Sequence, residues 1–378
     1  MRLATIVGLA CVLVVGAALA APRGVKPTTP PANAETFVRG VALGLFATDP
    51  EWDYGPLVDE IRARGATDVL VVANAYQSNR FASDIARRPG RSPSDATVAR
   101  TLEQVRRGGM RAALMPVVRL QTRGPHDWRG TITPADGLDA WFASYRRFVL
   151  PLARIAENAG AQRFVVGSEL SSLERYEDRW RALISELRRH FTHTLIYSAN
   201  WDHAHAVRFW DALDEVGLTA YFPLGSVSVS ASGSASGSVS VSASASASAS
   251  ASEPLSASTL ARAWQGPRAE ISALARRVGK PVLITEVGYP SQRTAANHPW
   301  DDASGADLDL HLQQRLYRSF CDAFTQTPSV SGFYVWNWFG FGGPRDVGFT
   351  PRGKPAASEL ARCFARPWPA PTHAGNAS

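Results

Sequence analysis

Two glutamates follow short apolar runs in this chain, and their positions suggest paired acid–base chemistry. Glu169 comes after the apolar residues 164–166 in RFVVGSEL, and Glu286 comes two residues after the apolar run 281–284 in KPVLITEVGYP. A charge at the end of a buried strand is costly unless it faces water, a partner or a ligand. Two carboxylates in one site are typical of glycoside hydrolysis, in which one protonates the leaving oxygen and the other attacks the anomeric carbon or activates water. The sequence therefore predicts Glu169 and Glu286 as a catalytic pair.

The elements that carry these glutamates alternate between strand and helix along the chain. Eight apolar runs predict strands, at 39–46, 67–74, 111–119, 163–169, 194–201, 217–223, 281–287 and 331–338. Amphipathic stretches predict helices at 55–64, 93–107, 137–159, 174–190, 206–214, 258–278, 309–325 and 355–365. Such alternation indicates a parallel sheet, and eight units close into a (β/α)8 TIM barrel, a fold of class α/β. An open doubly wound sheet is the alternative, but residues 44–53 lack the Gly-rich turn that usually follows its first strand.

The barrel explains why the two charges stand where they do. The C-terminal ends of barrel strands ring one mouth, where substrates bind. Glu169 ends the fourth predicted strand and Glu286 ends the seventh. We therefore expect both side chains to reach one site from roughly opposite sides, with their carboxyl groups about 5–5.5 Å apart if the enzyme retains anomeric configuration.

Six motifs at these strand ends resemble one family of enzymes. They are VGSELSS (166–172), YSANWD (197–202), TAYFPL (219–224), GKPVLITEVGY (279–289), YVWNW (334–338) and GFTPRGKPA (348–356). In this order they resemble glycoside hydrolase family 113, part of the large clan of retaining (β/α)8 glycosidases, over residues 37–366 without 225–252. The resemblance implies Glu169 as general acid/base, Glu286 as nucleophile and endo-β-1,4-mannan hydrolysis as the activity.

One position departs from the pattern of the clan. Its members usually carry Asn directly before the acid/base glutamate, where the amide contacts the sugar 2-hydroxyl, and this chain has Ser168. Mannose differs from glucose at C2, so the departure concerns the group that defines mannan. The sequence thus supports a retaining β-glycosidase more firmly than a mannanase.

Other residues at strand ends are candidates for binding substrate. Tyr221 resembles the clan tyrosine that hydrogen-bonds the nucleophile, and Trp336 is placed to form the floor under the sugar at the cleavage point. Trp338, two residues on, should face the same way as Trp336. Further candidates that could hold hydroxyl groups or serve as sugar platforms are Asn74, Arg119, Asn200 and Trp201, with Trp128 as a platform or a structural residue.

Composition and charge narrow the possible partners. The 378-residue chain has a formal net charge of +7, but its basic residues are scattered and form no run of five, so we expect no nucleic-acid partner. No CxxC or HExxH motif is present, and the cluster of Asp202, His203 and His205 lacks a third histidine at ligand spacing. We therefore expect no metal and no cofactor, and a polysaccharide or oligosaccharide as substrate.

The chain is expected to be one exported domain with unstructured flanks. Residues 1–20 have the features of a signal peptide, with Arg2, an apolar stretch and an A-x-A site, although an uncleaved anchor or a lipidated Cys11 are alternatives. Residues 21–36 predict a Pro-rich linker, 37–368 the hydrolase domain, and 369–378 a tail. Residues 225–252, built from Gly, Ser, Val and Ala, predict a flexible insertion after strand six. A periplasmic or secreted monomer without a stable membrane partner is the expected form.

The state of the cysteines and the exact function have alternatives. Cys321 and Cys363 lie on predicted helices that are neighbours in the outer ring, so we predict a disulfide, with two buried free thiols as the alternative. The alternatives for function are hydrolysis of another β-glycan or a bacterial exopolysaccharide, and a barrel that binds polysaccharide without cleaving it. The presence of both glutamates favours an enzyme.

Overall fold

A computed structural model describes residues 37–225, 255–325 and 327–368 of the chain. The predicted signal peptide (1–20), linker (21–36), C-terminal tail (369–378) and residues 226–252 of the predicted insertion lie outside the described residues. Within the described ranges, no helix is both long and apolar enough to span a bilayer.

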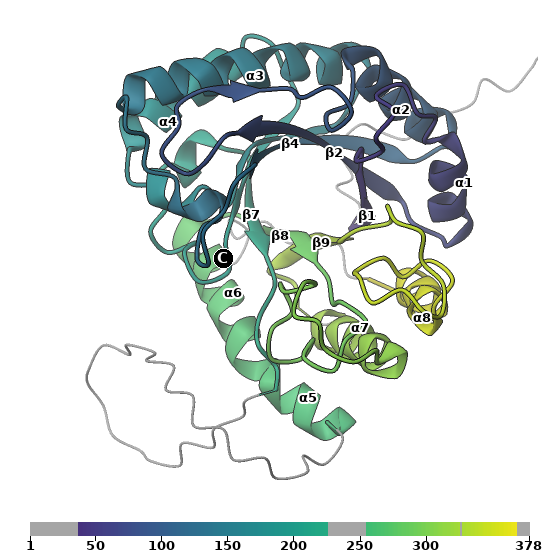
Figure 1. Ribbon diagram of the computed structural model, residues 1–378. Coiled ribbons are helices and arrows are strands. Elements are labelled where there is room, and N and C mark those ends of the chain that lie inside the picture. The colour runs from purple at the N-terminus through teal and green to yellow at the C-terminus, as the bar shows by residue number, and fades with distance from the viewer. Residues whose placement is uncertain (1–36, 226–254, 326, 369–378) are drawn as a thin grey trace, which may run out of the picture. The chain divides into compact units, whose positions relative to one another are not determined.

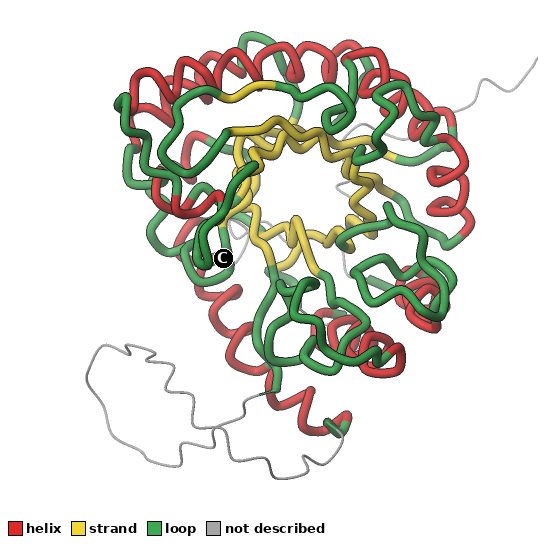
Figure 2. Tube along the Cα trace, viewed as in Figure 1, coloured by secondary structure: helices red, strands yellow, loops and turns green. Residues whose placement is uncertain are grey.

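Eight parallel strands close into a barrel, which confirms the predicted TIM fold (Figures 1 and 2). β1 pairs with both β2 and β9, and this double pairing joins the two ends of the sheet. The barrel strands are β1 (Val38–Gly44), β2 (Asp68–Gln77), β4 (Arg111–Leu120), β5 (Arg163–Ser168), β6 (Thr194–Ala199), β7 (Glu215–Thr219), β8 (Val282–Val287) and β9 (Val330–Val335). A short β3 (Ile85–Ala86) pairs antiparallel with the end of β2 and is too brief to leave a sequence pattern.

Helices surround the barrel, as the outer ring of Figure 2 shows. They are α1 (Gly55–Ala63), α2 (Asp95–Arg107), α3 (Leu138–Asn158), α4 (Glu177–Leu187), α5 (Ala257–Ala263), α6 (Gln265–Val278), α7 (Leu310–Phe324) and α8 (Pro355–Phe364). The helix predicted at 258–278 is divided into α5 and α6, because Pro267 has no N–H to donate to the carbonyl of Ala263. The helix predicted at 206–214 is wrong: only the 3₁₀ turn Trp210–Ala212 forms there, and the adjacent Phe209 and Trp210 are both buried.

The strands separate two apolar layers. Alternate strand residues fill the barrel interior, where Val72, Met115, Val165 and Leu283 are buried in one cluster. The opposite faces of the strands pack against the helices in a larger cluster. Because neighbouring residues of a strand point to opposite sides, membership of a layer shows which way each side chain near a strand end faces.

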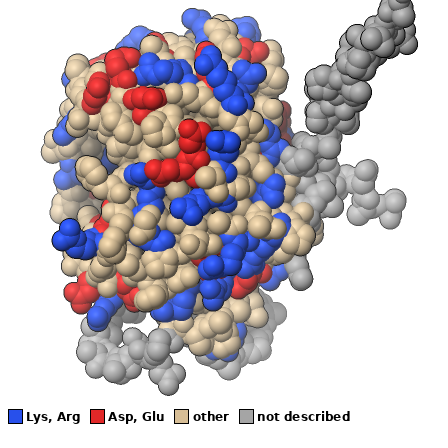
Figure 3. Space-filling view, turned by 90° about the vertical axis from the view of Figure 1, so that its right-hand side faces the viewer, with Lys and Arg blue, Asp and Glu red and all other residues tan. Residues whose placement is uncertain are grey.

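The outer ring is cross-linked between its last two helices. Cys321 of α7 and Cys363 of α8 form a disulfide with a Cα–Cα distance of 5.9 Å, which confirms the predicted pairing. Figure 3 shows one outer side of the barrel, where acidic side chains lie among the basic ones rather than apart from them. This mixed surface agrees with the scattered charge of the sequence.

Candidate active site

Glu169 lies directly after β5, in an unusual backbone conformation. It is the one non-glycine residue in the described part of the chain with a left-handed backbone, at φ 52°. A register shift in β5 precedes it, at Gly167, where an added Cβ would come within 2.9 Å of the rings of Trp180 and Tyr197. The Glu169 amide donates to the carbonyl of Ser198 on β6 at 2.8 Å, which fixes this turn against the barrel. Strain of this kind is typical of functional positions.

Glu286 lies on β8, where the pairing with β9 also shifts register. It is 2% exposed, so its carboxylate depends on protein partners. The Tyr221 hydroxyl donates to Oε2 at 3.0 Å, as predicted for this tyrosine, whereas Oε1 has no hydrogen-bond partner among the described residues. Gly288, two residues after Glu286, allows the segment after β9 to approach closely. A Cβ at this position would come within 2.6 Å of the Trp336 carbonyl oxygen.

An arginine that the sequence did not indicate links the two glutamates. Arg129, in the 3₁₀ turn Arg129–Thr131 after β4, places Nη2 at 2.5 Å from Oε2 of Glu169 and 3.9 Å from Oε1 of Glu286. The two carboxylates therefore face one another across one guanidinium group. A single arginine in a loop of irregular structure has no periodic signal, so no pattern in the sequence marked it.

Burial and the neighbouring charges alter the pKa of Glu286. Burial, and next the negative charge of Glu169, raise the pKa of Glu286 well above its usual range. The positive charge of Arg129 and the hydrogen bond from Tyr221 act in the opposite direction. Two carboxyls with one guanidinium are neutral when the pair holds a single proton, so the arrangement favours one protonated and one ionised carboxyl.

A second buried glutamate supports the turn at Glu169. Glu174 is 1% exposed and accepts a 2.9 Å hydrogen bond from the hydroxyl of Tyr197. The same hydroxyl accepts from the amide of Leu170, the residue after Glu169, at 3.2 Å. Burial raises the pKa of Glu174 to about 7, and the negative charge of Glu169 contributes in the same direction. Sequence reasoning missed both residues, although Tyr197 begins the YSANWD motif and Glu174 begins a predicted helix.

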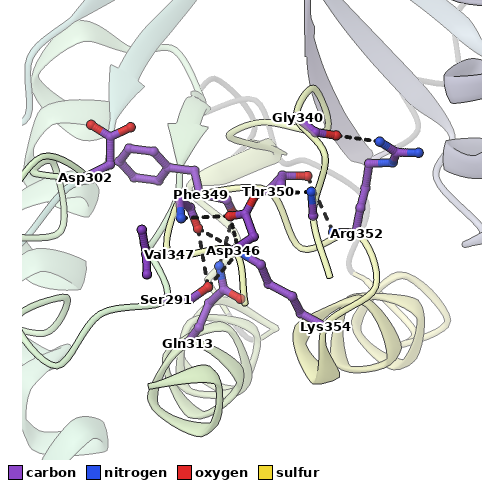
Figure 4. A network of polar contacts seen from close by, with 12 residues as sticks. Ser291, Asp302, Gln313, Gly340, Asp346, Val347, Phe349, Thr350, Arg352 and Lys354 are labelled. Atoms are coloured by element: carbon purple, nitrogen blue, oxygen red, sulfur yellow. Dashed lines mark hydrogen bonds and ion pairs between the residues drawn. The ribbon is translucent and has the colours of Figure 1, made fainter. Parts of the chain in front are cut away.

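A buried lysine ties together the loops after β8 and β9 (Figure 4). Nζ of Lys354 donates to Ser291 Oγ at 2.7 Å, to the Gly348 carbonyl at 2.8 Å and to Asp346 Oδ1 at 2.9 Å. The loop held in this way carries Phe349, whose ring packs against Tyr221 with centroids 6.2 Å apart. The network thus supports the tyrosine that contacts Glu286.

Three of the other predicted binding residues face the barrel mouth, defined here as the C-terminal ends of the eight strands. Asn74 and Arg119 continue the inward rows of β2 and β4 that contain Val72 and Val117. Trp336 packs against the same interior cluster, and its amide donates to the carbonyl of Val287 at 2.8 Å. Asn74 donates to the hydroxyl of Tyr76 and to the carbonyl of Arg91.

The remaining three predicted binding residues are Trp338, Trp201 and Asn200, and the structure places them in other surroundings. Trp338 belongs to the outer layer, where it is 1% exposed and its indole N–H donates to Glu60, so the prediction that it faces the same way as Trp336 is wrong. β9 ends at Val335, and strand alternation no longer holds beyond it. Trp201 packs on Phe222 and lines a hollow of about 330 Å³ beside α6, on the helix side. The side-chain amide of Asn200 donates a hydrogen bond to Asp202 and accepts one from the hydroxyl of Thr219.

Comparison with known proteins agrees with this architecture. A solved GH113 β-1,4-mannanase superposes with a TM-score of 0.73 at 21% identity, covering 88% of this chain and 100% of its own. The GH113 β-mannanase AaManA from Alicyclobacillus acidocaldarius, in complex with ManMIm, gives 0.71 at 24% identity over 88% and 98%. A GH5_18 protein from Streptomyces cattleya, in complex with Manβ1-4GlcNAc, gives 0.54 at 14% identity over 88% and 83%. No curated protein sequence matches the chain.

The sequence also matches a family model over most of the barrel. Residues 56–341 match the model of Glycoside Hydrolase Family 113. This range includes both glutamates, Arg129 and Tyr221. The protein is a glycoside hydrolase, and the chain belongs to glycoside hydrolase family 113.

Proposed function

We propose that the protein is a retaining β-glycosidase in which Glu286 is the nucleophile and Glu169 the general acid/base. The observation that carries this proposal is the contact of one Arg129 nitrogen with both carboxylates, at 2.5 Å and 3.9 Å. The two contacted oxygens can be no further apart than the sum of these distances. This upper limit accommodates the spacing of about 5–5.5 Å between the carboxyl groups of retaining enzymes, in which the second carboxylate attacks the anomeric carbon directly.

The hydrogen bond from Tyr221 supports the role given to Glu286. Oε2 of Glu286 accepts from Tyr221, which favours the ionised carboxylate, and leaves Oε1 free to attack the anomeric carbon. Glu169 gives its proton to the leaving oxygen as the glycosidic bond breaks and the bond to Oε1 forms. Water then attacks the glycosyl-enzyme, Glu169 takes the proton from that water, and Glu286 leaves as a carboxylate.

For the substrate, we propose a β-1,4-linked mannan, cleaved within the chain. Support comes from the family and from the solved GH113 β-mannanases with the same fold. We also propose that the protein is exported, on the basis of the signal-like residues 1–20 and the disulfide between Cys321 and Cys363, which suits an oxidising compartment.

Rescue by a small anion tests the two roles separately. In Glu286→Ala, azide can enter from the vacated side and should give a glycosyl azide of inverted configuration. In Glu169→Ala, activated aryl glycosides should still form the glycosyl-enzyme, and azide should then release a product of retained configuration. Product configuration is read by NMR, with β-mannan and β-glucan substrates compared for the wild type by reducing-sugar release.

The outcomes distinguish the alternatives. Interchanged configurations would reverse the two assignments while keeping the site. Full activity of both variants without azide would remove catalysis from this pair altogether. Release of sugar from β-glucan but not from β-mannan would leave the mechanism in place and overturn the proposed substrate.

A further inference from the structure

Exposed apolar side chains gather on one part of the molecule. Among the described residues, the large apolar side chains that are exposed to solvent are Trp52, Phe81, Trp300, Leu308, Phe341 and Val347. All of them lie in loops that follow the C-terminal ends of β1, β2, β8 and β9, which are neighbours in the barrel. Single exposed apolar residues are ordinary, but their concentration beside one half of the barrel mouth is typical of a binding surface.

A row of aromatic rings leads from the catalytic site to this surface. The row, called here the aromatic strip, consists of Trp336, Phe46, Phe339 and Trp52. Its ring centroids are 6.3 Å apart between Trp336 and Phe46, 5.8 Å between Phe46 and Phe339, and 6.4 Å between Phe339 and Trp52. At the inner end, the amide of Trp336 donates to the carbonyl of Val287, on the strand that carries the proposed nucleophile. The strip therefore joins the proposed cleavage point to an exposed tryptophan.

Trp52 is held in place and remains accessible. Its ring meets the rings of Tyr54 and Phe339 at interplanar angles of 78° and 88°, so neither of them stacks parallel on the indole. The residue is 37% exposed. Its amide donates to the Asp49 carbonyl at 3.2 Å, and the Tyr54 hydroxyl accepts from the amide of Ala47 at 3.0 Å. These bonds order the loop before a ligand arrives, which lowers the entropic cost of binding.

Phe341 lies further along the loop that carries Phe339, and it is fully exposed. The two residues are separated by one position, so their Cα atoms are no more than about 7 Å apart. Arg352 holds this loop: its guanidinium donates to the Gly340 carbonyl at 2.5 Å, and its carbonyl accepts from the amide of Gly343 at 2.7 Å (Figure 4). A fixed loop that keeps a phenylalanine in water gives up the stability that burial would provide, which is typical of a side chain used for binding.

We propose that Trp52 and Phe341 form a distal platform that stacks against sugar residues of a β-1,4-linked chain beyond the cleavage point. This inference rests on the proposed function, because it extends the same substrate chain outward from Trp336. A β-linked mannose ring carries three axial C–H bonds on one face, while its axial 2-hydroxyl points to the opposite face. The C–H face packs on aromatic rings, whose negative π faces attract the polarised C–H bonds. The platform therefore recognises the length of a neutral chain, and it accepts mannose and glucose alike.

Ligands of different length test the platform. Binding is measured by calorimetry on the full chain carrying Glu286→Gln, which separates binding from hydrolysis. The ligands are mannobiose and mannohexaose, and cellobiose and cellohexaose form a second pair with an equatorial 2-hydroxyl. In at least one pair, we expect the hexaose to bind at least about tenfold more tightly than the disaccharide, a factor equivalent to about 1.4 kcal/mol.

Variants identify the rings responsible. Trp52→Ala with Phe341→Ala should lower the ratio of hexaose to disaccharide affinity about tenfold, because only the longer ligand reaches the platform. Trp52→Phe with Phe341→Tyr keeps both rings and should keep most of the ratio. Val347→Ala is the matched control, because it removes an exposed apolar side chain from the same loop as Phe341 without removing a ring. Thermal unfolding of each variant checks that the barrel remains folded.

The results separate this inference from the proposed function. Equal affinity for long and short ligands in both pairs, or no binding of any of the four, would overturn the platform. A ratio that survives the double alanine variant in a folded protein, or falls as far in Val347→Ala, would also overturn it. A platform-dependent ratio in the cello-oligosaccharide pair alone would support the platform and count against mannan. The same dependence without hydrolysis of any polymer by the wild type would support the platform and count against the proposed catalysis.

Discussion

The guanidinium of Arg129 holds Oε2 of Glu169 at 2.5 Å, so the residue proposed to donate a proton is paired with a fixed cation. The same guanidinium stabilises the ionised form of Glu286 from 3.9 Å. Arg129 therefore contacts both carboxyl groups of the proposed pair and favours the ionised form of Glu286 that a nucleophile requires. A neutral residue in its place would leave two buried carboxyls without a counter-charge.

Arg129→Gln should move the acidic limb of the pH profile of kcat/KM upward. Arg129 lowers the pKa of Glu286, so removing its charge raises that pKa, and the ionised nucleophile forms only at higher pH. We expect a shift of about one pH unit, which is equivalent to about 1.4 kcal/mol. Arg129→Lys keeps the charge and should keep the limb close to that of the wild type. An unchanged limb in Arg129→Gln would show that Arg129 does not set the ionisation of Glu286.

Tyr221→Phe should lower kcat while leaving the fold intact. The variant removes the 3.0 Å hydrogen bond to Glu286 but keeps the ring that packs against Phe349. A hydrogen bond to a charged group contributes about 1.5–3 kcal/mol, so we expect kcat to fall about ten- to hundredfold. Steady-state kinetics and a thermal melt measure the two effects. A large fall in melting temperature with little change in kcat would make Tyr221 a structural residue.

Glu174→Gln should remove part of the pH dependence of stability. The folded-state pKa of Glu174 is raised to about 7, above its unfolded value of about 4.5, so the folded protein binds this proton more tightly. The free energy of unfolding should then fall as pH rises from about 4.5 to 7, by up to about 3 kcal/mol from this group. Gln cannot ionise and still accepts from Tyr197.

Urea unfolding at pH 5 and pH 8 provides the comparison for Glu174. The wild type should lose more stability over this range than Glu174→Gln, while Glu286 contributes equally to both proteins. If the two proteins lose the same amount, Glu174 does not keep a raised pKa in the folded state.

Cys321→Ser with Cys363→Ser should lower the free energy of unfolding. The disulfide joins α7 to α8 across 42 residues, and a loop of that length corresponds to about 2–4 kcal/mol in the chain-entropy account. Chemical unfolding of the oxidised wild type and of the double variant measures the difference. The barrel mouth is formed by other residues, so turnover at 25 °C should be retained. A double variant as stable as the wild type would contradict this estimate.

Much of this protein could be predicted from sequence because it depends on regular elements. Strands covered on both faces appear as continuous apolar runs, and their order along the chain determined the barrel. A charge that follows such a run must lie at the mouth, and this rule alone was enough to place Glu169 and Glu286 there. Arg119 followed from the same rule, whereas Tyr221 was identified through the resemblance to the clan.

Only the tertiary structure decided what lies around that pair. Arg129 lies in a loop and contacts Glu169 directly, while Glu174 is linked to the turn at Glu169 by the hydroxyl of Tyr197. Neither position belongs to a periodic pattern that the sequence could display. Trp338 turned outward because the alternation of β9 stops at Val335. The spacing of apolar residues is a local property of the chain. The contacts between loops at the ends of different strands depend on closure of the barrel. Closure brings residues that are distant in sequence together only once the chain has folded.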